Sequence, residues 1–162
     1  MTHGWFRTGI LILAATALGA CVAHKGNASN PTSVEPNSNT SLAARDGVFI
    51  HITHSGETDP HRVLMGLRMA ELMVGDRDVL VYFDIKGVEI PLKNADDTQM
   101  SPFPSSKAQL ATLIGKGAKV YVCPGCMEAA GKTAADLMPG IEMADKEAFF
   151  RFTRGRILTL DY

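Results

Sequence analysis

The stretch KAQLATLIGKGAKVYVCPGC, residues 107–126, decides which fold the chain adopts. Its first part, 107–117, predicts a helix that ends at a glycine, because apolar side chains recur at helical spacing on one face. These side chains are Leu110, Leu113 and Ile114. The second part, 118–122, is a short apolar run that predicts a buried strand. This strand leads directly to Cys123 and Cys126, so the pattern predicts a helix and a strand with two thiols at the strand's carboxyl end.

The sequence before this stretch shows the same alternation of strand and helix. Residues 48–52, VFIHI, predict a strand, and the turn-forming segment THSGETDP that follows predicts a loop. Asp59 and Pro60 favour the start of a helix, whose apolar residues recur until Gly75. Residues 78–84, DVLVYFD, then predict a second buried strand.

Shorter patterns complete the predicted domain. GVEIPLK, residues 87–93, predicts a short strand at an edge of the sheet, because its proline cannot donate to a ladder of hydrogen bonds. Residues 94–106 contain two prolines and predict a loop. Beyond Cys126 the pattern predicts a short helix, a strand at IEMA (141–144), a helix through DKEAFFRF (145–152) and a strand at RILTL (156–160).

Strands that alternate with helices predict an α/β domain with a mostly parallel, doubly wound sheet of five strands. Ligands of such sheets bind beyond the carboxyl ends of the strands. The loop after the first predicted strand carries His54 and Ser55, and the loop after the third carries Cys123. We therefore expect His54 and Ser55 to support Cys123 at one edge of the sheet.

The N-terminus has the layout of a signal peptide. Arg7 supplies a positive charge, and residues 10–18 form an apolar run that is too short to span a bilayer. The following LGAC, residues 18–21, resembles a bacterial lipoprotein signal, in which Cys21 is lipidated and becomes the mature N-terminus. An ordinary secretory signal is the alternative. Because Val22 is not the aspartate that retains lipoproteins at the inner membrane, we expect a periplasmic protein anchored to the outer membrane.

Composition divides the chain into three parts. Residues 1–20 are the predicted signal peptide. Residues 21–46 are rich in Asn, Ser, Thr and Pro and predict a flexible tether, because they cannot bury enough apolar surface to offset chain entropy. Residues 47–162 have the length and apolar content of one domain. The chain carries 16 basic and 17 acidic residues without a basic block, so nucleic acid is not an expected partner.

Cys123 and Cys126 are the candidate catalytic residues. A thiolate at the start of a helix lies near backbone N–H groups and the positive end of the helix dipole, which lower its pKa. Such a thiolate could take up sulfane sulfur as a persulfide, and the second thiol could resolve it. In an oxidising compartment the pair could instead be a structural disulfide. A metal site formed by Cys123, Cys126 and His54 is a weaker alternative.

The segments THSGETDPHR, ELMVGD, VLVYF, LIGKGAKVYVCPGCMEAAG and ILTLDY, in this order and spacing, resemble the DsrE/DsrF-like sulfur-relay family. The resemblance covers essentially the whole domain. It implies a flavodoxin-like three-layer α/β sandwich and a homo-oligomer, either a trimer or a hexamer. In relay members a cysteine at a strand end carries sulfur as a persulfide, and Cys123 stands at that position. The relay members work in the cytoplasm, and the lipoprotein-like signal of this chain is a departure from that pattern.

Together these observations predict a lipid-anchored periplasmic protein that handles sulfur or thiols, with Cys123 as acceptor and Cys126 as resolving thiol. We expect no cofactor, and a sulfur-donor or sulfur-acceptor protein as partner. Whether the protein turns over as an enzyme stays open at this stage. The alternative is a non-catalytic envelope module that binds a small ligand, a metal or a protein, with the cysteine pair as a structural disulfide.

Overall fold

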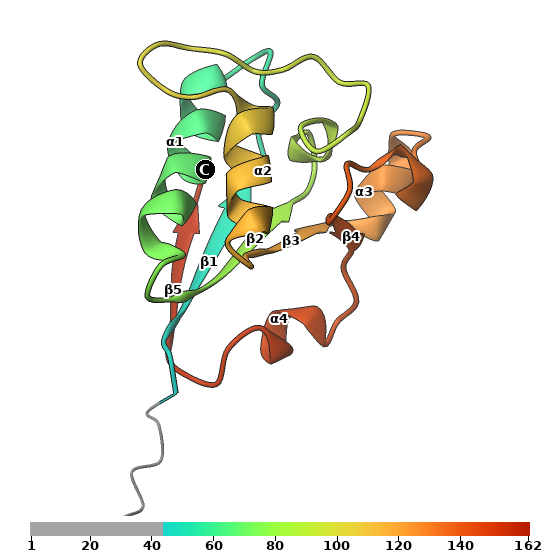
Figure 1. The fold of residues 1–162 in the computed structure, drawn as a ribbon. Helices are drawn as coiled ribbons and strands as arrows, with labels where there is room; N and C mark the ends of the chain where they lie inside the picture. The colour runs from blue at the N-terminus through green and yellow to red at the C-terminus, as the bar shows by residue number, and fades with distance from the viewer. Residues whose placement is uncertain (1–43) are drawn as a thin grey trace, which may run out of the picture. The chain divides into compact units, whose positions relative to one another are not determined.

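The computed structural model describes residues 44–162, and Figure 1 shows their fold. The predicted signal peptide, Cys21 and nearly all of the predicted tether lie outside the described residues. No helix between residues 44 and 162 is both long enough and apolar enough to cross a membrane.

The domain is built on a five-stranded sheet in which all neighbouring strands are parallel. The strands are β1 (Gly47–Ile52), β2 (Asp78–Phe83), β3 (Lys119–Val122), β4 (Glu142–Met143) and β5 (Ile157–Asp161). Their spatial order is β4-β3-β2-β1-β5. The predicted five-stranded, mostly parallel sheet is confirmed, and the carboxyl ends of all five strands lie at one edge.

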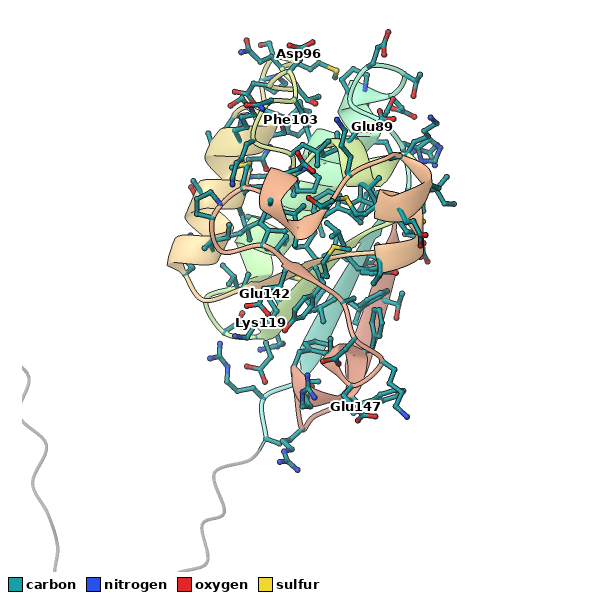
Figure 2. The ribbon with its side chains drawn as sticks, turned by 90° about the vertical axis from the view of Figure 1, so that its right-hand side faces the viewer. Glu89, Asp96, Phe103, Lys119, Glu142 and Glu147 are labelled. Atoms are coloured by element: carbon teal, nitrogen blue, oxygen red, sulfur yellow. The ribbon has the colours of Figure 1, made fainter. Side chains whose placement is uncertain are left out.

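Helices cover both faces of this sheet and give three layers (Figure 1, and from the side in Figure 2). Two longer helices, α1 (Pro60–Met73) and α2 (Ser106–Gly115), lie side by side on one face. Two shorter helices, α3 (Pro124–Ala129) and α4 (Ala148–Arg151), lie on the other. The predicted flavodoxin-like three-layer α/β sandwich is therefore confirmed.

Side-chain caps fix where the two longer helices begin. The Asp59 carboxylate accepts a hydrogen bond from the backbone N–H of Arg62 at 3.1 Å, and Pro60 occupies the first turn of α1, where it needs no N–H partner. The hydroxyl of Ser105 accepts from the N–H of Ala108 at the start of α2. Both helices thus begin within a residue of the predicted positions.

The two faces of the central strands carry different side chains. On the face under α1 and α2, Val48, Ile50 and Ile52 of β1 are completely or almost completely buried. On the opposite face, Phe49 and His51 of β1 are only half-buried. Because successive side chains of a strand point to opposite faces, the same alternation appears in β3 and at the end of β2, although Leu80 near the start of β2 is buried on this second face as well. The face under α3 and α4 is consequently the more open one, and we call it the open face.

Two local predictions are wrong. Residues 87–93 do not add a strand to the sheet: they form a single 3₁₀ turn, η1 (Gly87–Glu89), and then one isolated antiparallel bridge between Leu92 and Leu137. Pro91 has no N–H to continue a ladder, and the N–H groups of Lys86 and Gly87 donate to the carbonyl of Thr53, just after β1. The short helix α3 begins at Pro124 rather than after Cys126, so Cys126 lies within the helix.

Candidate functional site

Strand β3 places Cys123 at the carboxyl edge of the sheet. Its backbone N–H donates to the carbonyl of Phe83 at 2.9 Å, which continues the ladder between β2 and β3 by one residue. Cys123 is then the N-cap of α3, and its Sγ accepts a hydrogen bond from the N–H of Cys126 at 3.4 Å. The sulfur thus occupies the position that a serine or aspartate oxygen takes in an ordinary helix cap.

Cys126 lies one turn further along α3, and its sulfur meets a different backbone amide. The N–H of Ile85 donates to Cys126 Sγ at 3.2 Å. Ile85 has a φ of 48°, in the left-handed region, although it is β-branched and its side chain is 62 % exposed. This conformation costs about 1–2 kcal/mol for a residue other than glycine. The turn after β2 therefore holds a strained residue whose amide points at a thiol.

The two thiols are free and differ in acidity. Burial alone raises the pKa of the Cys123 thiol, but hydrogen bonds from the Cys126 thiol, the Cys126 N–H, the Tyr82 hydroxyl and the Gly125 N–H outweigh it, so the net pKa is lowered. The pKa of the Cys126 thiol is raised, first by its hydrogen bond to Cys123 and then by burial. Of the two thiols, Cys123 is therefore the one that loses its proton more readily.

A polar cluster lies on the open face, on β1, at the end of β5 and directly after β2. His51 Nδ1 is 3.0 Å from Asp161 Oδ1, and its Nε2 is 2.9 Å from Asp84 Oδ2. The contact between His51 and Asp161 is a hydrogen bond. The contact between His51 and Asp84 has the distance of an ion pair, but its geometry is not that of a hydrogen bond. The His51 ring stacks on Tyr82, with the ring centroids 5.7 Å apart.

Sequence reasoning did not identify this cluster. The patterns place its members in the predicted strands 48–52 and 78–84, or at the C-terminus, but assign none of them to the site. The available signal was the period of two along the strands: Tyr82 in β2 and Asp84 directly after it fall on one side, and Cys123 directly after β3 has the position that matches Asp84. When a cysteine follows a predicted strand, every second residue of the neighbouring strand is therefore a candidate to lie on the same side of the sheet.

Comparison with known proteins gives a match to the DsrE/DsrF-like family over residues 46–154. The chain belongs to this family. The resemblance inferred from short sequence segments is thereby confirmed. No curated protein is detectably similar to the chain in sequence.

Solved structures support the same DsrE/DsrF-like fold. The YchN protein of E. coli has a TM-score of 0.58 at 15 % sequence identity, and covers 72 % of this chain and 99 % of its own. A protein of unknown function from Methanobacterium thermoautotrophicum, MTH1491, has a TM-score of 0.53 at 17 % identity with the same coverage. At these identities the likeness concerns the fold alone.

The other predicted residues of this DsrE/DsrF-like site, His54 and Ser55, lie after β1, and β2 separates β1 from β3. Ser55 Oγ is 3.0 Å from the Thr58 hydroxyl and accepts from the Thr58 N–H, so its hydrogen bonds stay within its own turn. His54 Nδ1 is 2.9 Å from the hydroxyl of Thr53. Neither side chain hydrogen-bonds to Cys123 or Cys126 within residues 44–162.

The metal alternative required Cys123, Cys126 and His54 to converge. In the described part of the chain, no group of three or more His, Cys, Asp or Glu side chains is arranged to hold a metal ion. The cysteine pair of this DsrE/DsrF-like domain is instead surrounded by hydrogen-bond donors. Those donors suit a sulfur anion better than a cation.

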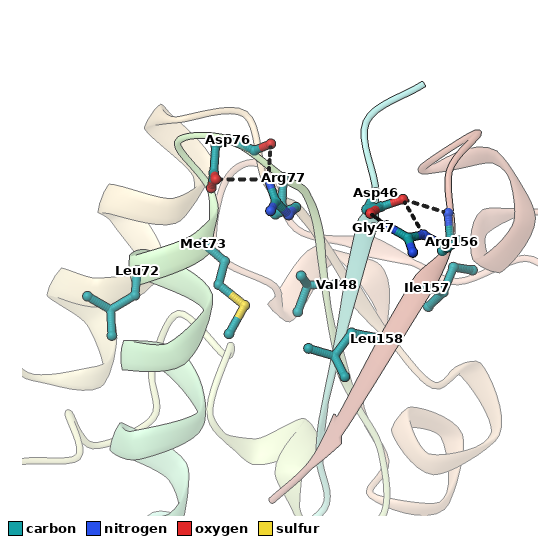
Figure 3. A pocket seen from close by; sticks show the side chains of 10 residues that line it. All are labelled: Asp46, Gly47, Val48, Leu72, Met73, Asp76, Arg77, Arg156, Ile157 and Leu158. Atoms are coloured by element: carbon teal, nitrogen blue, oxygen red, sulfur yellow. Dashed lines mark hydrogen bonds and ion pairs between the residues drawn. The ribbon is translucent and has the colours of Figure 1, made fainter. Parts of the chain in front are cut away.

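The DsrE/DsrF-like domain also has a groove at the opposite edge of the sheet (Figure 3). It has a volume of about 580 Å³ and is lined at the amino ends of β1 and β5 and by the last turn of α1. The charges on its rim pair with each other: Arg156 binds Asp46, and Arg77 Nη1 lies 2.8 Å from Asp76 Oδ2. Because these charges are already compensated, the groove is a poorer candidate than the cysteine pair.

Proposed function

We propose that this DsrE/DsrF-like protein carries sulfur as a persulfide on Cys123, and that Cys126 is the resolving thiol. One observation carries the proposal: Cys123 is a half-buried thiol that caps α3, its Sγ accepts a hydrogen bond from the Cys126 N–H, and its pKa is lowered while that of its neighbour is raised. The family in general serves sulfur relay. A thiolate of lowered pKa is the form of cysteine that attacks sulfane sulfur.

The proposed transfer is balanced without an external oxidant. The Cys123 thiolate attacks the sulfane sulfur of a polysulfide or a persulfide. A new S–S bond forms at Cys123, the S–S bond of the donor breaks, and the donor leaves as a thiolate with the bonding electron pair. The outer sulfur on Cys123 can then pass to an acceptor thiol in the same way.

Cys126 offers a second outcome. Its sulfur can attack Cys123 Sγ and expel the outer sulfur as hydrosulfide, which takes the proton of the Cys126 thiol. The product is a Cys123–Cys126 disulfide, which a thiol reductant must reopen. The position of the pair is compatible with this step, because Cys123 caps α3 and Cys126 lies in its first turn.

Mass spectrometry of the intact protein tests the proposal. Reduced protein that is offered an inorganic polysulfide should gain one sulfur atom and lose it again on treatment with a thiol reductant. A mass two hydrogens lower in protein that has seen neither reductant nor polysulfide would instead indicate the structural disulfide of the alternative envelope module, whereas the same loss only after polysulfide treatment is the disulfide that Cys126 closes. An unchanged mass would contradict the carrier function.

We further propose that the protein is anchored to the outer membrane through Cys21. The support is the sequence alone: an apolar run too short to span a bilayer, which ends in Gly19, Ala20 and a cysteine. Replacing Cys21 with serine should abolish acyl labelling and either release the protein or stall its processing. Membrane fractionation with a radiolabelled fatty acid measures this, and an unchanged distribution with unchanged label would contradict the anchor.

Assembly into a trimer or hexamer is a further proposal. Of the phenylalanines in α4, Phe149 packs on Tyr82 with ring centroids 4.9 Å apart, whereas Phe150 is 76 % exposed. Ile157 and Leu158 of the edge strand β5 are also about half exposed. Such side chains are typical of a surface that meets another subunit. Light scattering of protein made without the signal peptide should show at least a trimer, and a monomer at micromolar concentration would contradict it.

A further inference from the structure

The turn that directly follows β2 is fixed by hydrogen bonds to the end of β1 and to the residue after it. The N–H of Asp84 donates to the carbonyl of Ile52 at 3.2 Å. The N–H groups of Lys86 and Gly87 both donate to the carbonyl of Thr53 at 3.1 Å. A Cβ at Gly87 would collide with the Ile52 carbonyl oxygen, so the backbone of the turn lies directly against the end of β1. The turn therefore cannot shift without breaking several contacts with the sheet.

Ile85 is the residue of this turn whose N–H has a sulfur as its partner. The N–H donates to Cys126 Sγ at 3.2 Å, 41 positions further along the chain. The left-handed backbone of Ile85, with its φ of 48°, is costly for a β-branched residue, and its largely exposed side chain gains little packing in return. Such a conformation persists only where the surrounding structure holds it, which the contacts of the neighbouring residues do. The turn thus presents a rigid backbone donor to the sulfur of Cys126.

A side-chain contact adds to the rigidity of this turn. Asp84 Oδ2 lies 2.9 Å from His51 Nε2, and His51 Nδ1 lies 3.0 Å from Asp161 Oδ1. The residue before Ile85 is thereby connected to β1 and, through His51, to the end of β5. The direction of the Ile85 N–H is consequently set by the sheet and not by the helix that carries Cys126.

The groups around Cys126 act on its charge in opposite directions. The Cys123 thiol, burial and the Asp84 carboxylate raise the pKa of Cys126, whereas the Ile85 N–H lowers it. A backbone N–H can only donate, so it favours the ionised sulfur over the neutral thiol. The Ile85 N–H therefore offsets part of the opposing effects when Cys126 loses its proton.

We propose that the Ile85 N–H is a catalytic group of the resolving step, in which it stabilises the negative charge on Cys126 Sγ as this sulfur attacks Cys123 Sγ. This role rests on the carrier function proposed above. In the step the Cys126 thiol gives up its proton, an S–S bond forms between Cys126 and Cys123, and the bond from Cys123 to the outer sulfur breaks. The outer sulfur leaves with the bonding electron pair and takes the proton, as hydrosulfide. The N–H bond of Ile85 stays intact throughout.

An ester in place of the amide between Asp84 and Ile85 tests this role, because it removes the N–H and keeps the Ile85 side chain. It is made in the full-length protein by incorporating the hydroxy acid that corresponds to isoleucine. The readout is the pH dependence of Cys126 alkylation by iodoacetamide, measured by peptide mass spectrometry in a Cys123→Ser background. The loss of one hydrogen bond to an ionised sulfur should raise the midpoint of this profile by about one pH unit.

The matched control is the ester between Ile85 and Lys86. It removes a backbone N–H from the same turn, but this N–H donates to the Thr53 carbonyl and not to a sulfur. The midpoint should stay within about 0.3 pH units of the parent protein. Ile85→Gly keeps the N–H and should also keep the midpoint. An equal rise in both ester variants would overturn the inference, because the rise would then come from a loosened turn.

Hydrogen exchange covers the case in which the ester variant does not fold. In ¹⁵N-labelled wild-type protein the Ile85 amide should exchange slowly, and replacing Cys126 with alanine should speed its exchange by about tenfold. The amides of Lys86 and Gly87 are the internal control, because their acceptors are backbone carbonyls and their exchange should not change. Equal exchange of the Ile85 amide in both proteins would overturn the inference.

The carrier function and the role of Ile85 fail in different ways. If the protein gains sulfur but the ester at Ile85 leaves the Cys126 midpoint unchanged, the role of Ile85 is wrong and the carrier function stands. If the midpoint rises but no sulfur is gained, the hydrogen bond is supported and the carrier function is wrong. In the loaded protein the ester should slow the release of hydrosulfide about threefold below the pKa of Cys126, because the smaller thiolate fraction is partly offset by a higher nucleophilicity. Loading of Cys123 should be unchanged.

Discussion

Replacing Cys123 with serine should abolish sulfur uptake, whereas replacing Cys126 with serine should leave the protein trapped with a persulfide on Cys123. The expected loss in Cys123→Ser is complete, to the level of a chain without either cysteine, because a serine hydroxyl does not ionise in the range where a thiol does. Cys126→Ser should load as well as the wild type but lose its ability to expel the sulfur as hydrosulfide.

The comparison should be made by mass spectrometry after the same polysulfide treatment of both single variants. The pH dependence provides an internal check. The pKa of Cys123 is lowered, and a thiolate exists above its pKa, so loading should persist at pH values below the usual thiol pKa of about 8.5. If both variants gain the same amount of sulfur, or if neither gains any, the cysteine pair is a structural disulfide and not a sulfur carrier.

The second large effect concerns stability. Phe83 is the last residue of β2 and is completely buried, and its carbonyl accepts the N–H of Cys123. Replacing Phe83 with alanine should lower the free energy of unfolding by about 3–5 kcal/mol, because it opens a cavity in the core beneath α1 and α2. Denaturation by urea measures this, with the native baseline of each variant as reference.

Phe150→Ala is the control for this experiment. It removes the same side chain from a position that is 76 % exposed, so its effect should stay within about 0.5 kcal/mol. A similar loss in both variants would contradict the assignment of Phe83 to the core. Assembly of the protein into oligomers can change the result for this control. If the loss of stability in Phe150→Ala grows with protein concentration, Phe150 lies at a contact between subunits.

Much of the fold follows from local patterns in the sequence. The period of helix α2, the glycine after it and the short apolar run of β3 are all local, and together they place Cys123 at a strand end. The start of α1 is equally local, because Asp59 and Pro60 act on the turn that they begin. These elements could be predicted without knowledge of their neighbours.

The surroundings of the thiols could not be predicted in this way. The N–H of Ile85, which has a left-handed backbone, donates to the sulfur of Cys126, and the two residues are 41 positions apart. Asp161 reaches His51 only because β5 returns to the far side of β1. Each of these contacts joins segments that are distant along the chain, and a local pattern contains no information about them.

The position of β5 also has a consequence for how the chain is made. Of the strands described between residues 44 and 162, β1 is synthesised first, yet one of its two sheet neighbours lies about 110 residues further along. Until that neighbour emerges from the ribosome, one edge of β1 offers unpaired N–H and C=O groups, which can pair with other chains. Contacts of such long separation also slow folding. We expect the nascent domain to depend on protection from aggregation until β5 has been made.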